Sequence, residues 1–141
     1  MATTKLFVSH IKQPIHGHRA KAASRRSLDQ FGFRRTLELI LRYVRRGQQD
    51  GTMRLEYVGH GEIGGRPTYV FERRFPFTGD EEPYPDALLR YHIDQEWLVP
   101  TGCFSYADDK GTKLLGSYVL TDVEFNVGLE EQHFDPDRIW S

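Results

Sequence analysis

The clearest periodic pattern in the chain is a row of apolar residues at helical spacing. Large aliphatic side chains recur at i, i+3, i+4 and i+7, which places them on one face of an α-helix: Leu37, Ile40, Leu41 and Val44. Ser27 and Gln30 fit a capping box before this segment, and Gly47 is a suitable residue just beyond its end. We therefore predict a helical region over 27–47, with its main helix at about 34–46.

From residue 52 onward the period changes to two, which is typical of half-buried β-strands. Gly64-Gly65 and Asp108 to Gly111 are predicted to form hairpin turns. Pro100 lacks an amide donor, so its strand should lie at an edge or carry a bulge there. The alternating segments follow one another with short links, which favours an up-and-down meander; they lie at about 53–57, 69–75, 89–93, 97–106 and 113–125.

The predicted fold class is α+β, a curved antiparallel β-meander of about five to seven strands covered by one main amphipathic helix. We expect a single domain over 1–141. Its predicted parts are an N-terminal strand with a flexible basic segment (1–26), the helix (27–47), the antiparallel sheet (52–127) and a C-terminal cap (128–141). The N-terminal strand would contain Leu6, Phe7 and Val8, and the cap would use Leu129, Phe134 and Trp140 as apolar anchors.

Composition narrows the class of protein. Aromatic residues make up 13% of the chain, enough large rings for a small globular core. Segment 5–46 is basic and segment 122–137 is acidic, so the two can attract each other or the basic half can face an anionic partner. The basic segment lacks interleaved aromatics, so we expect no nucleic-acid partner. Cys103 is the single cysteine, and we expect it in the core; no apolar run is long enough for a transmembrane segment.

Candidate catalytic chemistry is confined to one weak pair. His92 and Asp94 are two residues apart on a predicted strand and therefore share a face, as an acid–base pair would require. The polar positions of an alternating strand are usually solvent-facing, so enzymatic activity is the less favoured interpretation. His16 and His18 are too few ligands for a zinc site. We predict no metal site and no cofactor.

Several short stretches together resemble a known family: Tyr91-His92-Ile93-Asp94, Leu98-Val99-Pro100, Leu114 to Tyr118, Asn126-Val127-Gly128-Leu129 and Phe134-Asp135. They look like the C-terminal part of the bacterial family named domain of unknown function 1571, and the resemblance extends over about residues 19–137. It implies a fold similar to the lipoprotein-carrier (LolA-like) type, a half-barrel with helices on its concave side and an apolar cavity. It also implies a secreted or periplasmic location, although we recognise no signal peptide in this sequence. It supplies no catalytic residues.

Three functions follow in order of preference. The first is a non-catalytic binding module that holds an apolar or lipid-like ligand between sheet and helix, with these predicted ligand-binding residues: Leu37, Ile40, Leu41, Val44, Tyr69, Phe71 and Tyr91. The second is an interaction or scaffold protein that forms a homodimer through an exposed sheet edge, because the chain lacks much of the N-terminal half of the family's sheet. The third is a hydrolase-type enzyme using His92, Asp94 and Glu72.

Overall fold

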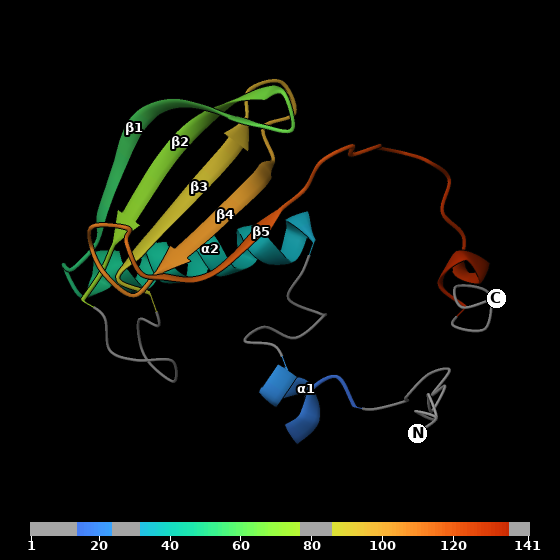
Figure 1. Cartoon of the computed structure of the whole chain (residues 1–141), viewed down its shortest axis with the longest axis horizontal. Helices are drawn as coiled ribbons and strands as arrows, with labels where there is room; N and C mark the ends of the chain where they lie inside the picture. Colours follow the sequence, from blue (N-terminus) through green and yellow to red (C-terminus); the bar gives the residue numbers. More distant parts are fainter. Residues whose placement is uncertain (1–13, 24–31, 77–85, 136–141) are drawn as a thin grey trace, which may run out of the picture.

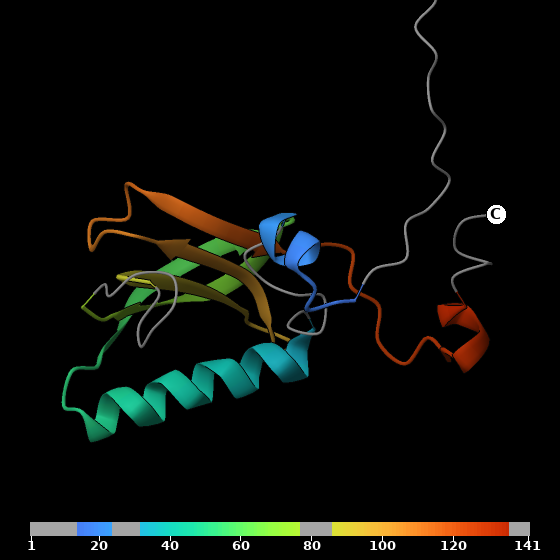
Figure 2. The ribbon, with the colours of Figure 1, turned by 90° about the horizontal axis from the view of Figure 1, so that it is seen from below.

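The structure, a computed structural model, describes residues 14–23, 32–76 and 86–135. It is an α+β fold in which five antiparallel strands form one curved, open sheet and a long helix lies against one face (Figures 1 and 2). The strands follow the order of the sequence across the sheet, so the predicted half-barrel-like meander is confirmed. They are β1 (Arg54–Ile63), β2 (Arg66–Arg74), β3 (Leu88–Asp94), β4 (Pro100–Tyr106) and β5 (Leu114–Val119).

The long helix, α2, spans Phe33–Gln49 and extends beyond both ends of the predicted core of the helix. Gly47 does not end it, contrary to the prediction. Asp50 is the C-cap, and Gly51, with a φ of 65°, adopts the left-handed conformation that follows a helix end. Gly47 instead allows close packing, because a Cβ there would lie 2.4 Å from Cε1 of Phe75.

The face that α2 turns toward the sheet differs from the predicted apolar row. Thr36 and Gly47 are the buried residues of the helix, and Ile40 packs against the core. Leu37 and Leu41 are 40% and 50% exposed, so only part of the predicted row packs against the sheet. Small and polar residues take the inner positions because they let the helix approach closely, and the Tyr118 hydroxyl donates a 2.8 Å hydrogen bond to Thr36 Oγ1.

The turns and bulges largely follow the sequence signals. Gly64 and Gly65 both have positive φ (57° and 77°) between β1 and β2, as a two-residue hairpin turn requires. The register between β3 and β4 shifts opposite Pro100 to Gly102, which confirms the bulge predicted at Pro100. β4 begins at Pro100 rather than at residue 97, because the backbone N–H groups of residues 96 and 97 donate to the Asp94 carboxylate and form a turn.

The core lies between α2 and the middle of the sheet. Leu89, Tyr91 and Cys103 are each 4% exposed and form its centre. Cys103 is thus a buried core residue, as predicted. Partly buried side chains from both layers surround this centre: Ile40, Phe71, Ile93 and Tyr118.

The two ends of the described chain differ from the predictions. A short helix, α1 (His18–Ala23), lies within the segment that was predicted to be flexible and basic. β5 ends at Val119, and the segment beyond it runs away from the sheet to the 3₁₀ helix η2 (Glu131–Phe134) (Figure 1). Leu129 and Phe134 are 61% and 64% exposed, so their predicted capping role is wrong. The expected strand at residues 6–8, the capping box at residues 27–30 and Trp140 lie outside the described residues.

Candidate ligand-binding face

α2 covers only part of the sheet face that it packs on. It lies closest to β4, while the outer strand β1 keeps large apolar side chains in contact with solvent. Leu55 is 47% exposed and Tyr57 is 52% exposed. The register places Leu55 beside Arg73 and then Leu89, so these side chains share one face of the sheet. By the same argument Tyr57 shares its face with the buried Tyr91.

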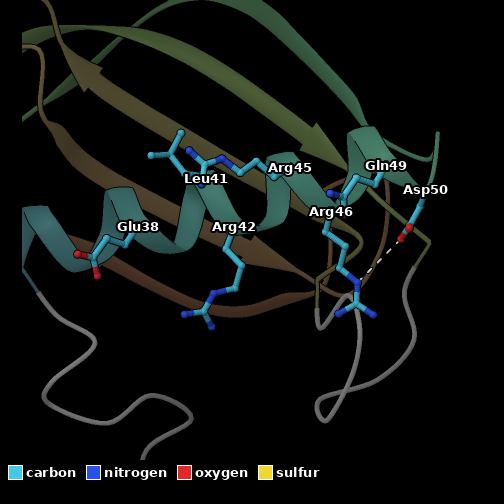
Figure 3. A pocket seen from close by; sticks show the side chains of 7 residues that line it. All are labelled: Glu38, Leu41, Arg42, Arg45, Arg46, Gln49 and Asp50. Carbon is cyan, nitrogen blue, oxygen red and sulfur yellow. Dashed lines mark ion pairs between the residues drawn. The ribbon is translucent and has the colours of Figure 1, made fainter.

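Apolar side chains lie on the side of α2 that faces this uncovered region, with Arg45 beside Leu41 (Figure 3). Leu37 and Leu41 are exposed there, and Val44 is partly exposed. In Figure 3, Leu41 points from the helix toward the side on which β1 and β2 lie, whereas Arg42 points the other way. We name the exposed and partly exposed apolar side chains of the helix and the two outer strands the open apolar face: Leu37, Leu41 and Val44 of α2 with Leu55, Tyr57, Tyr69 and Phe71 of β1 and β2.

Aromatic rings gather on the strand side of the open apolar face. The ring centroid of Tyr57 is 5.4 Å from that of Phe71 and 6.4 Å from that of Tyr69. His60 joins them, with its Nε2 3.2 Å from the Tyr57 hydroxyl and its Nδ1 2.7 Å from Nε2 of Gln95. These contacts hold the Tyr57 ring in place while it stays 52% exposed.

The predicted ligand-binding residues separate into two groups in the structure. Leu37, Leu41, Val44 and Tyr69 belong to the open apolar face, whereas Ile40 and Tyr91 lie in the core beneath the helix. Phe71 belongs to the open apolar face and also packs against the core. Sequence reasoning did not include Leu55, Tyr57 or His60 in the site. The alternation through residues 53–57 was a signal for the first two, but it could not show that their strand is left uncovered.

A buried arginine lies beside this face. Arg73, on β2, has no exposed surface, and its guanidinium carbon is 4.7 Å from the ring centroid of Tyr43 and 4.5 Å from that of Phe75. Its Nη2 is 3.6 Å from Oδ2 of Asp86, which is also buried and accepts a hydrogen bond from the Ser105 hydroxyl. Within the described part of the chain, no nitrogen of this guanidinium makes a hydrogen bond. No pattern of residues along the chain predicted this cluster.

The opposite face of the sheet is held by charged side chains. Glu72 is buried and accepts hydrogen bonds from Arg74 and, at 2.8 Å, from Nε of Arg90. Burial by itself raises the pKa of the Glu72 carboxyl, but the two arginines outweigh it and lower that pKa below its ordinary value. Arg74 also pairs with Glu56 at 3.0 Å, which extends the network to β1.

The two candidate catalytic residues lie on this charged face and have separate partners. Arg66 holds the Asp94 carboxylate with a 2.7 Å hydrogen bond from Nε, and this bond lowers the Asp94 pKa to about 2. His92 Nδ1 lies 3.0 Å from the Thr68 hydroxyl, and burial lowers the His92 pKa. The contacts in the described residues do not join His92 to Asp94. The hydrolase interpretation therefore stays a prediction without a shared cleft to support it.

The solvent side of α2 is a shallow basic hollow (Figure 3). Arg46 and Asp50 approach each other there at 3.9 Å, and Arg34 and Arg35 both pair with Glu38 nearer the start of the helix. The hollow is lined mainly by polar and charged side chains, so it does not suit an apolar ligand: Glu38, Leu41, Arg42, Arg45, Arg46, Gln49 and Asp50.

The residues that the structure describes contain neither a cluster of metal ligands nor a helix able to span a membrane. Across residues 14–23, 32–76 and 86–135, no group of three or more His, Cys, Asp or Glu side chains is placed to hold a metal ion. In the same ranges, none of the helices combines the length and the apolar character that crossing a membrane requires.

Comparisons with known proteins identify a family and a distant structural likeness. The model of the family "Protein of unknown function (DUF1571)" matches residues 2–138, and so begins nearer the N-terminus than the stretch in which we saw the resemblance. One solved structure, a domain assigned to outer membrane lipoprotein sorting in Vibrio parahaemolyticus, is 17% identical and covers 64% of this chain with a TM-score of 0.36. This chain covers 49% of that one, about half its length. No curated protein matches significantly.

Proposed function

This chain belongs to the DUF1571 family of unknown function, and we propose that it is a non-catalytic binding module whose open apolar face holds an apolar, lipid-like ligand. The observation that carries the proposal is the exposure of Leu55 and Tyr57 on the same sheet face as the core. Contiguous exposed apolar surface is unfavourable in water and commonly marks a binding site. A ligand that covers it gains about 25 cal/mol per Å² of apolar area removed from water.

The shape of the surface favours a slender aliphatic ligand. Apolar side chains approach from two elements, with leucines on α2 and aromatic rings on β1 and β2. None of the seven residues of the open apolar face is charged. Leu41 also lines the edge of the basic hollow, whose other residues are polar or charged. A hydrocarbon chain lying between helix and strands would contact both groups at once.

The test is binding of Nile red, an uncharged fluorescent apolar probe, to the full chain. We expect saturable binding, and we expect Leu55→Ser to weaken it about tenfold by removing apolar contact in the site. Leu114→Ser is the matched control, because Leu114 is 56% exposed but lies on β5 at the far edge of the sheet. The proposal is wrong if the probe does not bind saturably, or if both variants weaken binding equally.

A homodimer through the edge of the sheet remains the alternative. β1 is ten residues long, and among the described strands it pairs with β2 on one side only. Its ladder is interrupted, however, because the register shifts between Tyr57 and Gly59. Sedimentation velocity over a hundredfold range of concentration tests this interpretation, and a monomer throughout that range would exclude it.

A further inference from the structure

We infer that Arg73 is the polar anchor of the proposed ligand site and donates hydrogen bonds to a neutral carbonyl oxygen, such as that of an acyl ester. The inference rests on the proposed function and names the ligand class: an aliphatic chain that carries an uncharged carbonyl group. Arg73 is the feature of this region that apolar packing alone does not explain.

The donors of Arg73 lack acceptors. The guanidinium carries five N–H groups, and an arginine is always charged at physiological pH. None of its three nitrogens makes a hydrogen bond in the described part of the chain, although the side chain is fully buried. Stacking against Tyr43 and Phe75 uses the flat face of the group and leaves its in-plane N–H groups without partners. Buried donors without partners are rare in native proteins and call for an acceptor.

The charge of the cluster selects the kind of acceptor. Asp86 balances the charge of Arg73 across 3.6 Å, a separation too long for a hydrogen bond. The Ser105 hydroxyl holds the other carboxylate oxygen. A second anion at this place would put another buried negative charge beside Asp86, which is unfavourable. A neutral carbonyl satisfies the N–H groups without that cost.

The position of Arg73 suits the end of a chain held on the open apolar face. Leu55 is its register partner on β1, so the exposed surface begins one strand spacing away, about 4.8 Å. Phe71 lies two residues along β2 and therefore on the same face. Tyr43 and Leu55, the neighbours of Arg73 on α2 and β1, both keep exposed surface. A ligand would reach the guanidinium by moving these two side chains.

The experiment compares three ligands of equal chain length in displacing Nile red from the full chain: hexadecane, palmitate and methyl palmitate. We expect methyl palmitate to bind about tenfold more tightly than hexadecane, and palmitate to bind less tightly than its methyl ester. Arg73→Met should weaken binding of the ester about tenfold and leave hexadecane unchanged. Arg73→Lys, which keeps a charged donor, should lie between wild type and Arg73→Met.

Distinct outcomes overturn distinct claims. If Nile red does not bind to wild type, the proposed function fails. If Nile red binds but the ester shows no advantage over hexadecane, or if palmitate binds most tightly, the anchor inference fails while the proposed function stands. An equal loss for all ligands in Arg73→Met would show a structural role and also overturn the anchor.

A second measurement does not depend on the variants being folded. Methyl palmitate labelled with ¹³C at its carbonyl should show an infrared carbonyl stretch shifted to lower frequency when it is bound to wild type, as hydrogen bonding to a cation requires. An unshifted band, at the position seen in an apolar solvent, would contradict the inference.

Discussion

Two regions of the same sheet face carry similar side chains but differ in how much of each side chain is exposed to solvent. Leu89 and Tyr91 on β3 are each 4% exposed, whereas Leu55 and Tyr57 on β1 are 47% and 52% exposed. The difference is one of coverage. A helix is about 10 Å across and strands lie about 4.8 Å apart, so one helix covers roughly two strands. A described sheet of five strands with one long helix therefore leaves its outer strands uncovered, and Leu55 and Tyr57 make that surface apolar here.

The largest expected effect tests this comparison with one substitution on each side of Arg73. Leu89→Ala should lower the free energy of unfolding by about 3 kcal/mol, because it leaves a cavity in the core. Leu55→Ala should lower it by less than about 1 kcal/mol, because nearly half of the side chain is already in solvent. Urea unfolding measures both. Similar losses in the two variants would show that β1 is covered in solution.

Asp94 on the charged face provides the next effect, with a defined pH dependence. Its pKa is lowered to about 2 by the hydrogen bond from Arg66, so the interaction stabilises the fold above the ordinary carboxyl pKa and is lost as pH falls toward 2. Asp94→Asn should lower the free energy of unfolding by about 2 kcal/mol at pH 7. The gap between wild type and variant should shrink between pH 4 and pH 2. A gap independent of pH would contradict this assignment, and Asp109→Asn, at an exposed turn residue, serves as the control.

Gly47 tests how closely α2 packs against the covered part of the sheet. An alanine in a helix is ordinarily more stable than a glycine by up to about 1 kcal/mol. Here the added Cβ would lie 2.4 Å from the Phe75 ring, so Gly47→Ala should instead destabilise the protein by about 1 to 2 kcal/mol. Thermal unfolding monitored by circular dichroism measures this change, and Gln48→Ala at the next, exposed position is the control. A stabilised Gly47→Ala protein would mean that α2 does not sit this close to the sheet.

The smallest effect on stability is expected on the open apolar face itself. Leu41 is 50% exposed, so Leu41→Ser should change the free energy of unfolding by no more than about 0.5 kcal/mol. The same substitution should weaken Nile red binding several-fold. Urea unfolding and fluorescence titration separate the two readouts. A large loss of stability with unchanged probe binding would place Leu41 in the core and not in the site.

Much of the fold could be predicted because its signals are local. Alternation of apolar and polar residues indicated five strands in order, and Gly64-Gly65 identified the first hairpin. The face of α2 was less predictable, because Thr36 and Gly47 pack inward for reasons of close approach rather than hydrophobicity. An apolar row indicates a helix, but it does not decide which of its residues the sheet will cover.

The candidate site was predicted only in outline. Tyr69 and Phe71 could be found as aromatics on a strand. The exposure of Leu55 and Tyr57 depends on which strands α2 covers. The residue pattern within β1 cannot predict that. The Arg73 and Asp86 cluster joins residues that are not adjacent in the sequence, so only the tertiary structure brings them together.

The bulge in β1 affects whether the exposed edge of the sheet can pair with other chains at high protein concentration. Val58 is the extra residue, because Tyr57 pairs with Phe71 while Gly59 pairs with Val70. A second chain that added to this edge in regular register would meet the extra residue midway and lose its hydrogen-bond ladder there. Fibril growth needs long, flat and uninterrupted strands. One inserted residue therefore lets the protein keep an aromatic surface open to solvent while denying that edge to amyloid-like stacking.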